Sequence, residues 1–260
     1  MENVSLNSEI QTNREDRFFF IYSLILLGVV IAGFSPSLFL RVLFEPEPIP
    51  LYLHLHGALL TGWFVWLVVQ AKLIRNHNPS LHKKMGRFAA AYGVIVIVGG
   101  LMATFNAVGR DLGTGVTFAT NMADINPAMG GDLTYLDFVS GVVWGNMASV
   151  LTFGVLLAIA VFYRKKPDIH KRLILIATTA ILGPALTRIA RLDILGGEQG
   201  PFIILAILTL LASIVVHDLI TLKKAHKASL IAIVFALGVF GLSQRIAGSE
   251  FGQEFVRNMA

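Results

Sequence analysis

Long apolar runs separated by short charged loops dominate this sequence. The hydrocarbon core of a bilayer is about 30 Å thick, so a helix needs about 20 apolar residues to cross it. Runs of this kind must be helical, because lipid offers no water to their backbone groups. A membrane β-barrel would instead alternate polar and apolar residues, and these runs do not. The sequence therefore predicts an all-α, polytopic membrane helix bundle.

The pattern predicts about seven transmembrane helices and divides the chain into three parts. A polar cytoplasmic tail, residues 1–17, precedes the seven-helix domain, residues 18–244, and an outer tail, residues 245–260, follows it. The spans are expected at residues 18–40, 51–73, 85–106, 138–162, 172–190, 201–221 and 228–244. Pro184 is expected to kink the fifth span. The longest loop, residues 107–137, is glycine-rich and is expected outside.

Composition supports this class and excludes others. The 260 residues are 55% hydrophobic and 14% charged, whereas a soluble domain has about 25% charged residues. The absence of cysteine excludes disulfides, iron–sulfur clusters and thiolate metal sites. The net charge of +5 comes from positive residues in the loops between spans, so it indicates topology and no nucleic-acid partner.

The distribution of lysine and arginine predicts the orientation. One side of the predicted bundle holds fifteen of these residues, including every lysine, and the other holds six. The positive-inside rule then places the N-terminus in the cytoplasm and the C-terminus outside. The polar N-terminus lacks an early apolar region, so no cleaved signal peptide is expected. The predicted location is a cell (inner) membrane.

Five of the seven histidines lie in or at the ends of spans, where ionisable residues are functional candidates. His82, His170 and His217 share the cytoplasmic level on three different helices. Three imidazoles at one depth could hold a transition metal, and two opposed imidazoles could hold haem b. The alternative is that each of them is only hydrogen-bonded. Asp168 could cap the helix that His170 opens, or accept a hydrogen bond from its imidazole.

A second group of candidates lies at the outer end. His54 and His56 point about 200° apart on one helix, so they cannot bind one haem together. Arg188 and Arg191 could bind an anionic headgroup, a haem propionate or Asp193. His54, His56 and the two arginines could alternatively line an outward-facing pocket of a transporter.

A weak internal repeat links two of the histidines. The segment SLHKKMGRF around His82 is similar to DIHKRLILI around His170, at a shift of 88 residues. Each segment follows a span that ends in a basic loop. The second and third spans and the fourth and fifth spans are therefore interpreted as two copies of one helical hairpin.

The motifs HLHG, LHKKMGR and PDIHKRLILIAT resemble those of a set of uncharacterised bacterial multi-pass membrane proteins, over residues 51–190. More loosely, the chain is similar to cytochrome-b-like and haem-copper-oxidase-related families, in which span histidines bind haem. The resemblance implies electron transfer in the bacterial inner membrane, with a quinone or a respiratory complex as partner. The seven-span plan is also similar to zinc hydrolases of the adiponectin-receptor type, but their last-span HxxxH is absent here.

Three hypotheses about function follow from these patterns. The first is a membrane redox protein that holds haem or a metal. The second is a transporter or small-molecule-binding protein, and the third is a structural subunit of a membrane complex, with a homo-oligomer as a further option. Whether the chain is an enzyme stays open, because no nucleophile triad, phosphate loop or carboxylate pair is found.

Overall fold

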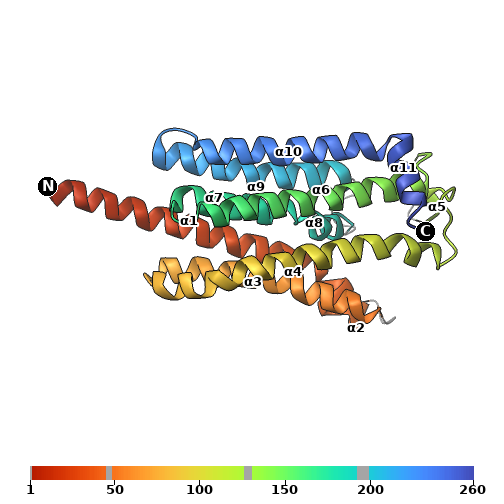
Figure 1. Ribbon diagram of the computed structural model, residues 1–260, viewed down its shortest axis with the longest axis horizontal. Coiled ribbons are helices and arrows are strands. Elements are labelled where there is room, and N and C mark those ends of the chain that lie inside the picture. The colour runs from red at the N-terminus through yellow and green to blue at the C-terminus, as the bar shows by residue number, and fades with distance from the viewer. Residues whose placement is uncertain (1, 45–48, 126–130, 192–198) are drawn as a thin grey trace.

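The computed structural model describes residues 2–44, 49–125, 131–191 and 199–260, and these form an elongated bundle of helices (Figure 1). From the N-terminus the helices are α1 (Glu2–Phe34), the π-helix η1 (Ser35–Phe39), α2 (Arg41–Phe44), α3 (Leu51–Arg75), α4 (Pro79–Leu112), α5 (Met122–Ile125), α6 (Tyr135–Phe162), α7 (Pro167–Ala180), α8 (Gly183–Ala190), α9 (Gln199–Leu222), α10 (Lys227–Ala247) and α11 (Glu250–Arg257). Strand pairing in these ranges is limited to an isolated bridge between Asn121 and Thr134.

Six of these helices are long and apolar enough to cross a membrane, and the bent pair α7 and α8 gives a seventh if it counts as one span. Their outer faces carry large exposed apolar side chains, as on Val94 of α4 and Val234 of α10. A soluble protein rarely exposes apolar surface on this scale. The predicted all-α, multi-pass membrane bundle is therefore confirmed.

Both predicted tails contain helix. Helix α1 begins at Glu2, so the polar tail continues the first span and does not form a separate segment. No glycine or proline occurs before Gly28 to end the helix there. At the other end, α11 folds back on α6, and Trp144 donates its indole N–H to the backbone oxygen of Gly252 at 3.2 Å. The predicted outer tail is thus a short amphipathic helix.

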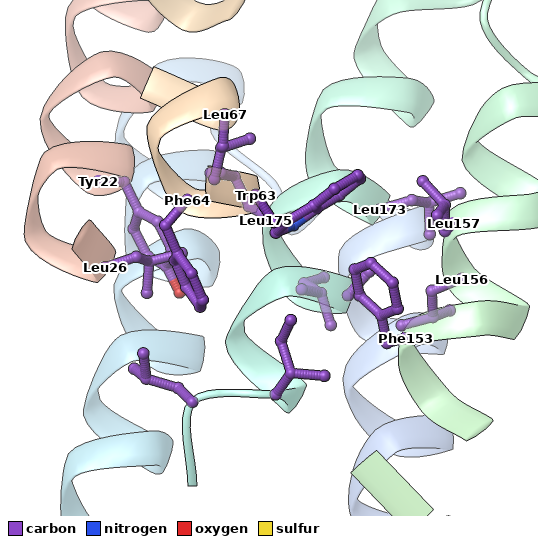
Figure 2. Packing of buried hydrophobic residues seen from close by; sticks show 14 of the residues in the cluster. Tyr22, Leu26, Trp63, Phe64, Leu67, Phe153, Leu156, Leu157, Leu173 and Leu175 are labelled. Carbon is purple, nitrogen blue, oxygen red and sulfur yellow. The ribbon is translucent and has the colours of Figure 1, made fainter. Parts of the chain in front are cut away.

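Helix α7 lies in the middle of the bundle, and most of its side chains from Arg172 to Thr179 are buried. Trp63 of α3 donates its indole N–H to the Thr178 hydroxyl at 3.2 Å. The Tyr22 hydroxyl of α1 is 2.9 Å from the Thr179 hydroxyl. Figure 2 shows Tyr22 and Trp63 within the main apolar cluster. Helices α1 and α3 are thereby fixed to the central helix by hydrogen bonds as well as by apolar packing.

The fifth span is bent by 46° between α7 and α8. Pro184 occupies the first turn of α8, where its missing N–H is tolerated. The kink predicted from this proline is confirmed. At the same level α1 passes very close to α8, because a Cβ on Gly33 would collide with the backbone oxygen of Ala185. The bend is therefore packed tightly against the first span.

Candidate functional site

The end of the bundle that carries Lys83, Lys84 and Lys171 is called the lysine-rich end below. Here α4 and α7 begin alike, each with a proline in its first turn and a histidine three residues later. The imidazole of His82 lies beside that of His170, with ring centroids 6.4 Å apart and planes at 83°. Two of the three predicted ligands are therefore brought together, one from each copy of the weak repeat.

His170 is oriented by the backbone of the preceding helix. Its Nδ1 lies 2.8 Å from the carbonyl oxygen of Ala160 in the last turn of α6. An imidazole that donates Nδ1–H to a carbonyl has an unprotonated Nε2 with a free lone pair. The predicted partner, Asp168, does not fill this role, because its side chain is 69% exposed and makes no capping hydrogen bond. The α6 terminus supplies the acceptor instead.

His82 is half-buried and lies against the backbone carbonyl of Gln70 at the end of α3. Its Nδ1 is buried and has no hydrogen-bond partner among the described residues. A buried polar atom without a partner carries a cost of about 1–3 kcal/mol, so each such atom in a folded protein needs an explanation. A ligand atom would provide one for His82.

Further unpartnered atoms lie on α3 next to this histidine. The indole N–H of Trp66 and both amide atoms of Gln70 are buried, and in the described part of the chain they have no hydrogen-bond partner. These two residues are one helical turn apart and face α4, where Trp66 contacts Tyr92 with ring centroids 6.0 Å apart. We call Trp66, Gln70 and His82 the α3–α4 polar face.

The third predicted ligand, His217, lies in another environment. Its ring stacks on Phe18 of α1 at 3.9 Å between centroids and meets the edge of Phe19 at 5.7 Å. In the described ranges, no three His, Cys, Asp or Glu side chains are grouped closely enough to hold a metal ion. A three-histidine metal centre from His82, His170 and His217 is therefore not formed in this arrangement, because α1 aromatic rings enclose His217.

The sequence prediction missed a buried ion pair beside His217. Arg172 is one of the fifteen basic residues on the side that the sequence predicts to be cytoplasmic, yet its side chain is 0% exposed. Its Nε and Nη2 donate to Oδ1 of Asp218 at 2.9 and 2.5 Å, and Nη1 donates to the backbone oxygen of Asp168 at 2.8 Å. The adjacent His217 and Asp218 in the sixth predicted span were the one sequence signal for it.

The second oxygen of Asp218 is also fully bonded. Oδ2 accepts hydrogen bonds from the Ser229 hydroxyl at 2.6 Å and from the backbone N–H of His226 at 3.3 Å. Asp218 therefore joins α7, α9 and α10 at one point. We call Arg172, Asp218, Ser229 and His226 the ion-pair cluster.

His226 begins α10 within this cluster. Its Nδ1 accepts the N–H of Ala228 at 3.1 Å, which is possible only when that nitrogen is unprotonated. Burial lowers the pKa of His226 below its ordinary value, and the positive charge of Arg172 lowers it further. Neutral His226 thus serves as the N-cap of α10.

Helix α1 completes this end of the bundle with an acidic residue. Glu15 accepts a hydrogen bond from Lys171, and its other oxygen lies 3.8 Å from Nη2 of Arg172. Charged groups of three helices, α1, α7 and α9, therefore meet at the lysine-rich end, and α10 joins them through Ser229 and His226. Every ionised group named in this network has an oppositely charged partner, as burial of charge requires.

The candidates at the opposite end are not gathered into one group. His54 is exposed, whereas His56 is half-buried near Gly99, which agrees with their predicted divergence. Arg188 donates a hydrogen bond to the hydroxyl of Ser37, and its guanidinium lies over the ring of Phe34. Arg191 is exposed. Asp193, the predicted partner of the two arginines, lies outside the described residues.

The donor set at the lysine-rich end fits some cofactors better than others. Structural zinc takes four protein ligands and catalytic zinc takes three. In the described part of the chain, His82 and His170 have no third ligand of the His, Cys, Asp or Glu type. Haem requires only two axial protein ligands, because the porphyrin supplies the other four. The residues present therefore fit a haem better than a bare divalent ion.

The fold and this site define a multi-pass α-helical membrane protein with a paired-histidine site at one end of its bundle. Comparisons of the chain with models of known protein families, with curated proteins and with solved structures find no match. Function is therefore argued from the residues of the site themselves.

Proposed function

We propose that this chain is a membrane electron-transfer protein that binds a b-type haem between His82 and His170. The observation that carries the proposal is the separation of the two rings, which is 6.4 Å between centroids. Two imidazoles bound to opposite sides of one iron, each with a metal–nitrogen distance of about 2 Å, have centroids roughly 6 Å apart. The observed spacing supports ligation of one iron by both rings.

The hydrogen bond of His170 gives independent support. Histidines that bind metals nearly always donate their other N–H to a carbonyl, a carboxylate or water, which fixes the ring and raises ligand basicity. Ala160 supplies such a carbonyl at 2.8 Å from Nδ1. Nε2 of His170 is then the ligating atom. His82 contributes a buried nitrogen that has no other partner in the protein.

The protein's own residues would hold and shield the group. His82 and His170 would fix it between α4 and α7, and the apolar bundle would keep the site away from bulk water. A bound haem would supply one-electron redox chemistry. The partner is proposed to be a quinone or a respiratory complex, because either would exchange electrons with a carrier inside the membrane.

An optical spectrum of the purified protein tests this proposal. We expect a Soret band in protein purified with haem available, and its loss in His82→Ala and His170→Ala, because each variant removes one of two axial ligands. His217→Ala and His54→Ala are matched controls that should keep the band, since neither residue belongs to the pair. The proposal fails if wild-type protein binds no haem, or if the controls lose the band as the two ligand variants do.

Orientation and location are part of the proposal. The concentration of every lysine at one end supports a cytoplasmic lysine-rich end in a bacterial inner membrane, with the C-terminus outside. Reporter fusions after Ala260 and within the loop at Asn76 would test this. Reporters that need the cytoplasm should be active at Asn76 and inactive after Ala260.

A second candidate function, a transporter, is favoured by the bend of 46° between α7 and α8. Discontinuous helices at membrane depth form the binding sites of many transporters. Stopped-flow flux of candidate anions into proteoliposomes tests it, with Arg188→Gln as the variant, since that arginine lies next to the bend. Flux that Arg188→Gln does not change would remove this candidate.

A further inference from the structure

We propose that Trp66 and Gln70 bind the head of a lipid-soluble quinone or quinol at the α3–α4 polar face. The inference rests on the proposed function for its role in electron transfer, but its binding chemistry is argued from different atoms. His82 and His170 hold the haem in that proposal, whereas Trp66 and Gln70 have no part in it.

No described residue uses the hydrogen-bonding capacity of these two side chains. The indole N–H of Trp66, the amide nitrogen of Gln70 and its amide oxygen are all buried and unpartnered. Within lipid each such group costs several kcal/mol, because water cannot replace the missing partner. Together they offer donors and an acceptor within one helical turn. A quinol could satisfy all three atoms, because a hydroxyl both donates and accepts, and a quinone could satisfy the two donors with its carbonyl oxygens.

The side of Gln70 that faces α4 meets a glycine. A Cβ placed on Gly86 would have the Gln70 amide oxygen as its neighbour within 4 Å, at an ordinary contact distance of 3.8 Å. At Gly62, farther along the α3–α4 interface, a Cβ would collide with the Tyr92 hydroxyl. The interface is therefore less crowded beside Gln70 than at Gly62.

The position of this face favours a ligand that enters from the membrane. Gly86 and Tyr92 lie four and ten residues beyond His82 along α4, which is about 6 and 15 Å deeper at the helical rise of 1.5 Å per residue. Lys83, Lys84 and Arg87 lie close to the level of Gly86, and the helix is apolar from Phe88 onward. A ligand with a polar head beside Gln70 and an apolar tail along the rest of α4 matches this change.

The aromatic side chains beside this face also favour a lipid-soluble ligand with a flat ring. The rings of Trp66 and Tyr92 meet edge to face at 74°, so aromatic side chains lie next to the unpartnered atoms. Flat rings with opposed oxygens are the chemistry of quinones and quinols. Carbonyl oxygens would accept from the Trp66 indole and the Gln70 amide nitrogen, and a quinol hydroxyl would donate to the Gln70 amide oxygen.

Binding of decylubiquinone to the full-length protein in detergent, measured by thermal-shift titration against a micelle blank, tests the proposal. A ligand that binds the folded state raises the unfolding temperature with its concentration. We expect Trp66→Phe and Gln70→Leu each to weaken binding about tenfold, the cost of one or two lost hydrogen bonds. Decylbenzene has the same tail without oxygens and should give no shift.

Matched controls separate recognition from general disruption. Trp144→Phe and Gln244→Leu remove an indole and an amide that already have partners in Gly252 and Gly141, so quinone affinity should stay at the wild-type value. Wild-type affinity in both Trp66→Phe and Gln70→Leu, or an equal shift with decylbenzene, would overturn the proposal. Circular dichroism of the ligand-free variants shows whether they are folded.

One more variant separates this inference from the proposed function. His170→Ala should lose the Soret band and still bind decylubiquinone as the wild type does. A wild-type protein that binds haem and no quinone would overturn the inference alone. A protein that binds quinone through Trp66 and Gln70 and never binds haem would support the binding site and overturn the proposed function.

Discussion

The lysine-rich end holds two polar groups of opposite character. In the ion-pair cluster, Asp218 accepts from Arg172, Ser229 and His226, and both carboxylate oxygens are fully bonded. On the α3–α4 polar face, the side chains of Trp66 and Gln70 have polar atoms with no partner. A satisfied cluster in a low-dielectric interior holds helices together, whereas unsatisfied atoms carry a cost that a ligand can remove. This difference identifies the ion-pair cluster as a structural contact between helices and the α3–α4 polar face as a candidate binding site.

The largest expected effect comes from disrupting the ion-pair cluster. Asp218→Ala leaves the Arg172 guanidinium buried without its charge partner, and we expect a loss of about 3–5 kcal/mol in the free energy of unfolding. Denaturant unfolding in mild detergent, followed by circular dichroism, measures it. Asp168→Ala is the matched control, because that carboxylate is exposed and its ion pair with Lys171 contributes about 0–1 kcal/mol.

The double variant Arg172→Met/Asp218→Leu sharpens this result. Apolar residues that replace both partners of a buried ion pair restore much of the lost stability. We therefore expect it to be more stable than Asp218→Ala. Equal stability of Asp218→Ala and wild type would contradict the structural role of the cluster.

An effect of opposite sign is expected on the α3–α4 polar face. Gln70→Leu removes two unpartnered amide atoms and keeps a similar volume, so the ligand-free protein should become more stable by about 1–2 kcal/mol. Ser229→Ala should destabilise by about 1.5–3 kcal/mol, because it removes a hydrogen bond to a carboxylate. The unfolding temperatures of both variants, measured in one detergent, give the comparison. A destabilised Gln70→Leu would show that the amide is paired in the folded protein.

The smallest expected effect is the pH dependence of stability that the ion-pair cluster produces through His226. The pKa of His226 is lower in the folded protein than its ordinary value, so the unfolded chain binds more protons between the two values. The contribution of His226 to the free energy of unfolding is complete above its unfolded pKa of about 6.5, and it is lost as the pH falls from there to the lower pKa of the folded state. Protonation also removes the acceptor that caps α10.

His226→Asn isolates this contribution, because asparagine caps a helix and does not titrate. The wild type should lose more stability than His226→Asn between about pH 7.5 and about pH 5.5, on either side of the ordinary imidazole pKa. Unfolding temperatures at the two pH values provide the measurement. Equal losses in the two proteins would remove His226 as the titrating group.

The pairing of His82 with His170 could be anticipated only in part. The similar segments around them predicted equivalent positions at two helix starts, and the structure places both after a proline in the first turn. That His217 joins Phe18 instead could not be predicted, because it depends on the position of α1 against α9. The distinction between a two-histidine and a three-histidine site therefore came from the structure.

The burial of Arg172 shows the same limit. Its neighbours Lys171 and Arg164 made it look like one more loop cation. Its partner Asp218 is 46 residues away on another helix, so no local pattern connects them. Charge counts predict which end of a span a residue occupies, whereas the rotation of each helix decides whether its side chain faces lipid, water or the core.

By itself the sequence determined the all-α membrane class, the approximate bounds of the spans and the break at Pro184, because apolar length and proline chemistry act locally along the chain. Tertiary structure decided that Asp218 meets Arg172, that His82 meets His170, and that Trp66 and Gln70 keep unpartnered atoms. These outcomes depend on how helices distant in sequence are rotated and packed against one another, and such packing is a property of the whole bundle.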